Sequence, residues 1–348
     1  MISIKDVKYC PVVSTRDAEA RGFSELNNST LDSLLPVMEI TRSRRSGTNP
    51  DGDIHRSKDR LLHTLDGRPF VIDVSALGSQ SNTQTSELLD PANAFGNWTS
   101  FVGNHLPDEA VPVIHLEDPF NPADFLAQIG NIPARFGAVA LRLPLNYGYI
   151  PEVVGAFNGA RRDCVVLVDA AYISESSRNS VVRQMAGLLP LVSQLRPKIC
   201  APLSSSFPSS VLDPGYGQDD SGCFPLSEVG VSEAMKGIAK DHGIEMVHGD
   251  YSTIHPNDFT GTVTNWVPRV DVPLDTQILY HRERRPTGGY IQCAQRMVLD
   301  GRYVPISPCW GIDQVTLAAT GAPEGRSPAF WISVRLNIHI ERQINRLR

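Results

Sequence analysis

Polar residues that could do chemistry stand at the ends of eight short apolar runs in the sequence. The candidate catalytic side chains at these ends are Glu39, Asp73, His115, Glu117, Asp169, His248 and Asp250. The candidate substrate-binding side chains are Arg42, Arg142 and Tyr251. The starts of the same runs are largely apolar, so polarity gathers at one end. Burying several carboxylates together is costly unless they are paired or bind a cation, and this pattern predicts a functional cluster.

Three interpretations of this cluster remain open. In the first, carboxylates bind a divalent cation for phosphoester hydrolysis, and His115 or His248 serves as acid or base. The carboxylate ligands would then be Glu39, Asp73, Glu117 and Asp169. In the second, arginines and carboxylates form a pocket for a small polar or anionic ligand. In the third, the carboxylates are structural, because they pair with Arg42 or Arg142 or cap the helices that follow.

The segment Val247–Tyr251 (VHGDY) concentrates three of the candidate residues. A histidine such as His248 titrates near neutral pH, and Gly249 would let the backbone approach a ligand closely. Asp250 could orient a neighbouring group. A five-residue pattern of this kind has low specificity by itself.

The apolar runs predict parallel strands that are buried on both faces. They are Tyr9–Val13, Leu34–Ile40, Pro69–Val74, Val111–Glu117, Ala138–Leu143, Cys164–Asp169, Lys198–Leu203 and Ile244–Asp250. Amphipathic segments separate them, as at Asp53–Leu65 and Ser177–Leu195. Eight strands that alternate with helices over about 250 residues predict an α/β fold, a TIM-like (β/α)8 barrel. The alternative is an open doubly wound sheet, but no G-x-G-x-x-G motif follows the first run.

Residues 1–255 are therefore assigned to the barrel, and residues 256–348 to a C-terminal extension packed on it. The extension is expected to contain a β-hairpin. Its strands would be Gln277–Arg284 and Tyr290–Val298, joined by a PTGG turn.

An amphipathic helix is expected to close the chain at Pro328–Arg348. Its apolar stripe needs a surface to cover, which favours packing across the barrel. Arg335 and His339 lie a turn apart on this helix. We interpret them as a solvated helix face; the alternative is that they point toward the rim of the barrel or a partner.

Composition excludes several classes of protein. Lys and Arg number 32 against 38 Asp and Glu, and a net charge of −6 makes nucleic-acid binding improbable. None of the six cysteines forms a CxxC pair, which argues against a structural zinc and suits a reducing compartment. No secretory signal and no membrane-spanning apolar run is visible, so the chain is expected to be soluble and cytoplasmic.

Four segments together resemble a known family. They are the opening YCPVVSTRDAEARGFSEL, the run LLPVMEI, the segment VHGDY and the late helix SPAFWISVRLNIHIERQI. The sequence resembles the beta protein family, which is associated with phages and with bacterial mobile or defence loci, over most of its length. The resemblance implies no activity and no catalytic residue. It implies a phage, prophage or antiviral-defence context, with a regulatory partner encoded nearby.

Two functions from different classes follow. The chain could be a hydrolase or small-ligand binder that acts on a phosphorylated or other polar substrate at the run ends, with a divalent cation as cofactor in the first interpretation. Alternatively, it is a non-catalytic interaction protein, such as a toxin or defence component, that docks a partner protein through its extension. A deep pocket at the run ends favours the first, and an exposed apolar patch after Ile254 favours the second.

Overall fold

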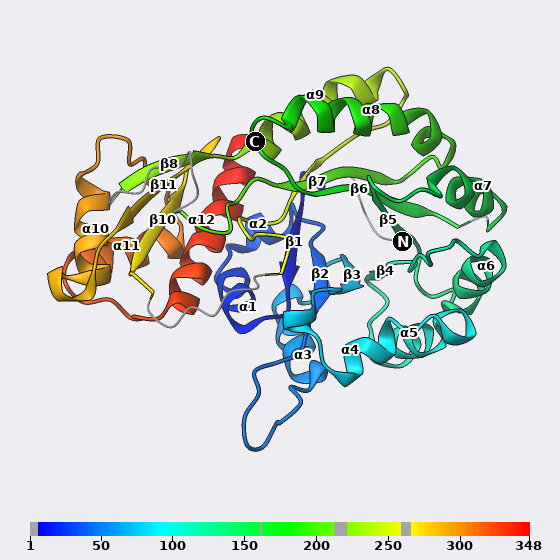
Figure 1. The fold of residues 1–348 in the computed structure, drawn as a ribbon, viewed down its shortest axis with the longest axis horizontal. Coiled ribbons are helices and arrows are strands. Elements are labelled where there is room, and N and C mark those ends of the chain that lie inside the picture. The colour runs from blue at the N-terminus through cyan, green and yellow to red at the C-terminus, as the bar shows by residue number, and fades with distance from the viewer. Residues whose placement is uncertain (1–5, 161, 212–220, 259–265) are drawn as a thin grey trace.

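The computed structural model describes residues 6–160, 162–211, 221–258 and 266–348 of the chain. It is a mixed α/β fold with two parallel sheets, one antiparallel sheet and covering helices (Figure 1). The strands are β1 (Tyr9–Ser14), β2 (Val37–Ile40), β3 (Phe70–Val74), β4 (Ala110–Pro112), β5 (Val139–Pro144), β6 (Cys164–Tyr172), β7 (Ile199–Ser205), β8 (Ser221–Pro225), β9 (His248–Asp250), β10 (Arg269–Pro273) and β11 (Gln277–Arg282).

Helices follow most of the parallel strands. The α-helices are α1 (Asp17–Ser24), α2 (Asn28–Leu31), α3 (Ile54–Leu65), α4 (Thr83–Leu88), α5 (Ala92–His105), α6 (Pro122–Asn131), α7 (Ile150–Ala160), α8 (Arg178–Gln194), α9 (Ser227–Lys240), α10 (Gly289–Leu299), α11 (Trp310–Ala319) and α12 (Pro328–Leu347). Short 3-10 turns lie at Gly78–Gln80 and Arg285–Thr287. The predicted helix at Asp53–Leu65 is α3, and the side chain of Asp53 caps it by accepting from the backbone N–H of His55.

The parallel strands form a five-stranded sheet in the order β4-β3-β2-β1-β9 and a three-stranded sheet in the order β5-β6-β7. Two isolated parallel bridges join these sheets at their edges. Val113 pairs with Ala140 at one edge, and Cys200 pairs with Met246 at the other. Each of the eight predicted runs therefore contains one parallel strand.

The fourth predicted run is too long at its carboxyl end, because β4 ends at Pro112. The side chain of Gln128 takes over the backbone hydrogen bonds of His115. Gln128 Oε1 accepts from the His115 N–H at 2.7 Å, and Gln128 Nε2 donates to the His115 carbonyl at 3.2 Å. His115 and Glu117 therefore stand beyond the strand.

The parallel strands are buried on both faces because two apolar cores lie on their opposite sides. One core consists of alternate strand residues, whose side chains point away from the helices. It includes Val37, Val71, Ala140 and Leu167. The larger core lies between the other strand faces and the helices. This arrangement explains why the runs are almost continuously apolar.

The antiparallel sheet has the strand order β10-β11-β8. It packs against α10 and α11 around a separate apolar core. The predicted hairpin is wrong: β11 pairs with β10 and β8, and Tyr290–Val298 lies within α10. The buried side chains of α10 include Tyr290, Cys293, Ala294 and Met297. This spacing is that of one helix face, so the PTGG segment leads into a helix.

The closing helix α12 lies between the extension and the β1–α1 part of the chain (Figure 1). Leu336 and Ile340 belong to the larger core, whereas Val334 and Ile338 belong to the core of the extension. The helix is therefore buried on opposite faces.

The interpretation of Arg335 and His339 as a solvated face of α12 is wrong. Arg335 is 5% exposed and donates from Nη1 to Asp271 at 2.7 Å. His339 is fully buried, and its Nε2 lies 2.8 Å from Asp250 Oδ2. Both polar side chains are tolerated inside because each has a carboxylate partner.

Candidate active site

A cavity of about 1340 Å³ opens at the carboxyl ends of the parallel strands. Its floor is formed by strand residues that come directly after the smaller apolar core, the one that contains Val37, Val71 and Leu167. Glu39, Asp73 and Asp169 each stand two positions after a core residue on the same strand. Since side chains alternate along a strand, these carboxylates continue the same face and enter the cavity.

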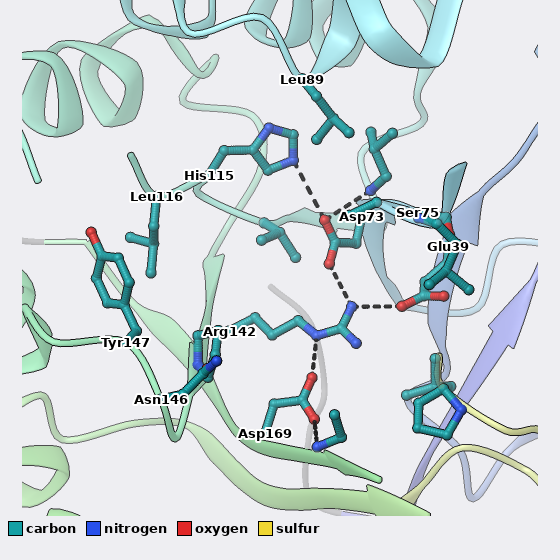
Figure 2. Close-up of a pocket in the computed structure, with 18 of the residues that line it drawn as sticks. Glu39, Asp73, Ser75, Leu89, His115, Leu116, Arg142, Asn146, Tyr147 and Asp169 are labelled. Carbon is teal, nitrogen blue, oxygen red and sulfur yellow. Dashed lines mark hydrogen bonds and ion pairs between the residues drawn. The ribbon is translucent and has the colours of Figure 1, made fainter. Parts of the chain in front are cut away.

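The guanidinium of Arg142, on β5, joins the three carboxylates at the floor (Figure 2). Its Nη1 lies 2.7 Å from both Glu39 Oε1 and Asp73 Oδ2, and its Nε lies 2.8 Å from Asp169 Oδ2. Nη2 donates to the hydroxyl of Tyr251 at 2.8 Å, and this hydroxyl donates to Asp169. The cluster therefore combines residues from five strands or strand ends.

Burial and charge act on the acids of the floor in opposite directions. Burial raises the pKa of Glu39, although the charge of Arg142 partly offsets it. Burial would also raise the pKa of Asp73, but its contact with His115 and the Arg142 charge outweigh burial and hold the pKa at about 2. Burial would lower the pKa of Arg142, yet Tyr251 and the carboxylates raise it well above the ordinary value. Arg142 therefore stays charged.

His115 lines the cavity next to Asp73. Its Nε2 lies 3.4 Å from Asp73 Oδ1, and neither ring nitrogen makes a hydrogen bond among the described residues. The imidazole stacks on Trp98 at a centroid distance of 4.8 Å and meets the ring of Phe95 edge-on. Apolar rings hold the imidazole in place while a nitrogen is left unpaired, which is unusual for a buried polar group.

The rim of the cavity carries further polar groups. Glu117 is half-buried, and burial followed by the charge of Asp124 raises its pKa. Tyr147 donates its hydroxyl to the Glu117 carbonyl, and Asn146 stands beside it. Both follow β5 in the loop PLNYGYI. They lie beyond the apolar run, so the polar ends of the runs do not include them.

The structure brings together most of the residues predicted from the sequence. The predicted residues that line the cavity are Glu39, Asp73, His115, Glu117, Arg142, Asp169 and Tyr251. Arg42 does not line it; it lines a smaller neighbouring cavity, and its Nη2 donates to the Ser79 carbonyl at 3.1 Å.

His248 and Asp250 do not line the cavity either, and this corrects the expectation of a single common pocket. Both side chains are fully buried on the opposite face of β9. Gly249 and Tyr251 take the inward positions, and a Cβ on Gly249 would lie 2.7 Å from the Pro202 carbonyl oxygen. The alternation along β9 therefore turns His248 and Asp250 away from the site.

Asp250 is instead the centre of a buried polar cluster behind the strands. Its carboxylate accepts from Tyr9 Oη and from the Ser252 N–H, and contacts Nε2 of both His248 and His339. Burial would raise the pKa of Asp250, but the two histidines hold it well below its ordinary range. This cluster joins β1 and β9 to α12, so we assign Asp250 a structural position.

One protein-family model matches the sequence over nearly its whole length. The model of the family described as "Beta protein" matches residues 9–345. The chain belongs to the Beta protein family. A relative in that family, "Protein beta" of Enterobacteria phage P4, is 27% identical over 353 aligned residues, which cover 99% of this chain and 94% of the relative.

Two solved structures resemble this Beta protein family member distantly. A hyperthermophilic endo-β-1,4-glucanase in complex with substrate is 8% identical, with a TM-score of 0.43, over 77% of this chain and 97% of that chain. A triazine hydrolase variant is 13% identical, with a TM-score of 0.32, over 69% and 50% of the two chains. Both are too distant to indicate an activity. Within the described residues, no helix combines the length and apolarity needed to cross a bilayer.

Proposed function

We propose that this Beta protein family member binds a small polar, hydrogen-bond-donating ligand in the main cavity and hydrolyses it with His115 and Asp73 as an acid–base pair. The observation that carries the proposal is the arrangement around Arg142, whose single guanidinium is divided among three carboxylates, so that acidic groups outnumber cations in the cavity. Among the described residues, six carboxylates line the cavity against one arginine: Glu19, Glu39, Asp73, Glu117, Asp118 and Asp169.

The electrostatics of the floor favour an uncharged or cationic ligand over an anionic one. A guanidinium has five N–H donors, and the contacts of Arg142 with Glu39, Asp73, Asp169 and Tyr251 occupy four of them. Arg142 therefore has little capacity left to bind an anion. Carboxylates keep free lone pairs after one ion pair, so they can accept from hydroxyl or amine groups of a ligand.

The same geometry disfavours the divalent-cation interpretation. The guanidinium of Arg142 already lies between the carboxylates of Glu39, Asp73 and Asp169, where a cation would have to sit. Within the residues described, no group of three or more histidine, cysteine or carboxylate side chains is arranged to hold a metal ion. We therefore assign the positive charge of the site to Arg142.

The acid–base chemistry available is proton transfer at His115. Asp73 remains ionised at neutral pH, because its pKa is held at about 2, and can stabilise a protonated imidazole. His115 could then take a proton from an attacking water. Glu117, whose pKa is raised by burial, could supply a proton to the leaving group from the rim.

We also infer that the two parallel sheets close into one (β/α)8 barrel. The bridges Val113–Ala140 and Cys200–Met246 connect both pairs of sheet edges, which supports closure. Helix α12, which packs on β1 and contacts β9 through His339 and Asp250, would then take the place of the eighth barrel helix. The segment between β9 and α12 would then be an insertion in the barrel.

We also propose that the protein acts in the cytoplasm of a phage-carrying cell.

A thermal-shift screen tests the ligand class. The screen compares neutral polyols and sugars, amines, divalent cations and phosphate compounds on the wild-type protein and on Asp73→Asn. We expect at least one neutral or amine compound to raise Tm of the wild type, and this rise to be lost in Asp73→Asn. Stabilisation by divalent cations that is lost in the same variant would support the metal interpretation instead.

A second candidate function is docking of a partner protein encoded nearby. It is favoured by three exposed apolar side chains at and after the end of α10: Val298, Leu299 and Val304, of which Leu299 is 84% exposed. Replacing Leu299 and Val304 by serine should abolish co-purification with such a partner when the two are expressed together. Unchanged co-purification would exclude this surface as the docking site.

A further inference from the structure

A second cavity, of about 580 Å³, adjoins the main one. The two share Glu19, Gln80, Ile254 and His255 in their walls. Their charges differ in sign. Four arginines line the second cavity: Arg16, Arg42, Arg44 and Arg335. Its lining carboxylates, Asp17 and Glu19, already have partners. Asp17 pairs with Arg60 at 3.0 Å, and Glu19 accepts from the Ser14 N–H at 2.8 Å and lies 3.9 Å from Nη1 of Arg16.

Arg335 is the buried cation of this cavity. Its Nη1 donates to Asp271 at 2.7 Å and its Nε donates to Thr253 at 3.2 Å, while Nη2 has no acceptor among the residues that the structure describes. Asp271 is shared with Arg269, whose Nε lies 2.7 Å away, so one carboxylate faces two guanidinium groups. A surplus of positive charge therefore remains inside the wall.

The N-terminus of α1 adds donors to the same cavity. Arg16 is the N-cap residue of α1, and no side chain caps the helix there. Asp17 and Ala18, in the first turn, line the cavity. The first N–H groups of a helix have no acceptor within the helix, and its dipole favours a negative charge at this end.

Arg42 completes the positive wall. Its Nη2 contacts the Ser79 carbonyl, which fixes the side chain at the cavity and leaves its other donors uncommitted. Burial lowers the pKa of Arg42 from its ordinary value, and the charges of Arg45 and Arg16 lower it further. This mutual repulsion would be relieved by a bound anion.

We propose that the second cavity binds the phosphate groups of a small phosphorylated ligand. The arginines, among them Nη2 of Arg335, and the first turn of α1 supply the donors. The uncharged remainder of the ligand reaches the carboxylate-rich main cavity, a step that rests on the function proposed above. A ligand with a phosphate at one end and a hydroxyl-bearing, hydrolysable bond at the other fits this pair of cavities, because the phosphate matches the arginine-lined wall and the hydroxyl groups can donate to the carboxylates beside His115 and Asp73.

Titration calorimetry with inorganic phosphate and inorganic tripolyphosphate tests the anion site. The variants are Arg42→Gln and Arg16→Gln, and the control is Arg183→Gln on the exposed face of α8. We expect saturable tripolyphosphate binding that weakens as salt rises, and a loss of about tenfold in affinity in each cavity variant because a charge-assisted hydrogen bond is removed. Far-UV circular dichroism melts verify that every variant is folded.

The outcomes separate this proposal from the main-cavity function. Asp73→Asn should keep tripolyphosphate affinity within about twofold, because Asp73 does not line the second cavity. If tripolyphosphate binds as expected but no neutral compound binds the main cavity, the anion subsite stands and the hydrolase proposal fails. Absence of saturable binding, or an equal loss in Arg183→Gln, would overturn the anion subsite. Tighter binding of a long oligonucleotide than of tripolyphosphate would overturn the small-ligand class.

Discussion

At the scale of single residues, Arg142 determines both the charge and the stability of the main cavity. Its guanidinium holds three carboxylates that would otherwise repel one another in a buried position. This cluster has two consequences. It keeps Asp73 ionised beside His115, and it uses up the donors that an anionic ligand would need.

Substitution of Arg142 should show how much its charge stabilises the folded protein. In Arg142→Met the three carboxylates lose their counter-charge, and we expect the free energy of unfolding to fall by about 3–5 kcal/mol at pH 7. Because the unpaired carboxylates then gain protons in the folded state, part of the loss should return at pH 5. Urea unfolding at both pH values measures this, with the exposed Arg183→Met as control. An equal loss at both pH values would contradict the assignment.

Glu228 gives a second prediction at this scale, on pH dependence. Burial raises its pKa to about 7, above the ordinary value of 4.5, and the Asp250 charge contributes. A raised carboxyl pKa means that the folded state holds the proton more tightly. The wild type should therefore lose stability as pH rises from about 4.5 through 7.

The neutral variant Glu228→Gln should escape this loss. Its advantage over the wild type should grow by about 3 kcal/mol between pH 4 and pH 8, since a tenfold change in proton affinity corresponds to about 1.4 kcal/mol. Chemical unfolding across this range measures the difference. The exposed Glu152→Gln on α7 serves as control, and an advantage that does not change with pH would rule out proton binding as its cause.

At the scale of elements, the packing of α1 against α12 depends on a glycine. A Cβ on Gly22 would lie 2.4 Å from the Ser333 carbonyl oxygen on α12. Gly22→Ala should therefore push the helices apart and lower stability by about 1–3 kcal/mol. On the exposed side of α7, by contrast, a Cβ on Gly155 would meet no described atom within 4 Å.

Gly155→Ala should consequently stabilise the protein, by about 0.5–1 kcal/mol, since alanine favours helix more than glycine does. Thermal unfolding of both variants gives the comparison. If Gly22→Ala were as stable as Gly155→Ala, the close approach of α1 and α12 would be wrong.

Much of the fold could be predicted from the sequence because apolar runs report strands directly. The face of the sheet on which each side chain lies could not be predicted, since strands that are buried on both faces are apolar at every position. For this reason the sequence does not tell which of the neighbours Asp250 and Tyr251 points into the cavity; in the structure only Tyr251 lines it. The burial of Arg335 and His339 was also unreadable, because their partners Asp271 and Asp250 lie far away in sequence.

At the scale of the whole molecule, α12 couples the extension to the parallel strands. It contributes to two apolar cores and to the Asp250 cluster. A chain truncated before residue 259 would lose this helix and expose the apolar surface that it covers. We expect that truncated protein to aggregate on expression. A soluble product with a cooperative melt would show that the extension is dispensable.

The molecule also carries its two cavities side by side at one end of the parallel strands. Carboxylates dominate one and arginines the other, and they share part of their walls. Residues from the loops after β1, β2, β3 and β9, together with α12, contribute to the second cavity. The lining of the second cavity therefore combines residues from the first and the last parts of the chain.

His115 is the residue that we propose as the acid–base group of the main cavity, and we further propose that one of its unpaired ring nitrogens hydrogen-bonds the ligand. The imidazole packs against the rings of Trp98 and Phe95, so a phenylalanine ring should fit in its place and His115→Phe should fold, with a lower stability because the contact with Asp73 is lost.

Titration calorimetry of the strongest neutral or amine ligand on the wild type and His115→Phe, with Tm measured in parallel, tests this role of His115 most directly. We predict that affinity falls at least about tenfold while the variant still melts cooperatively, at a lower Tm than the wild type. Unchanged affinity in a folded His115→Phe variant would contradict it.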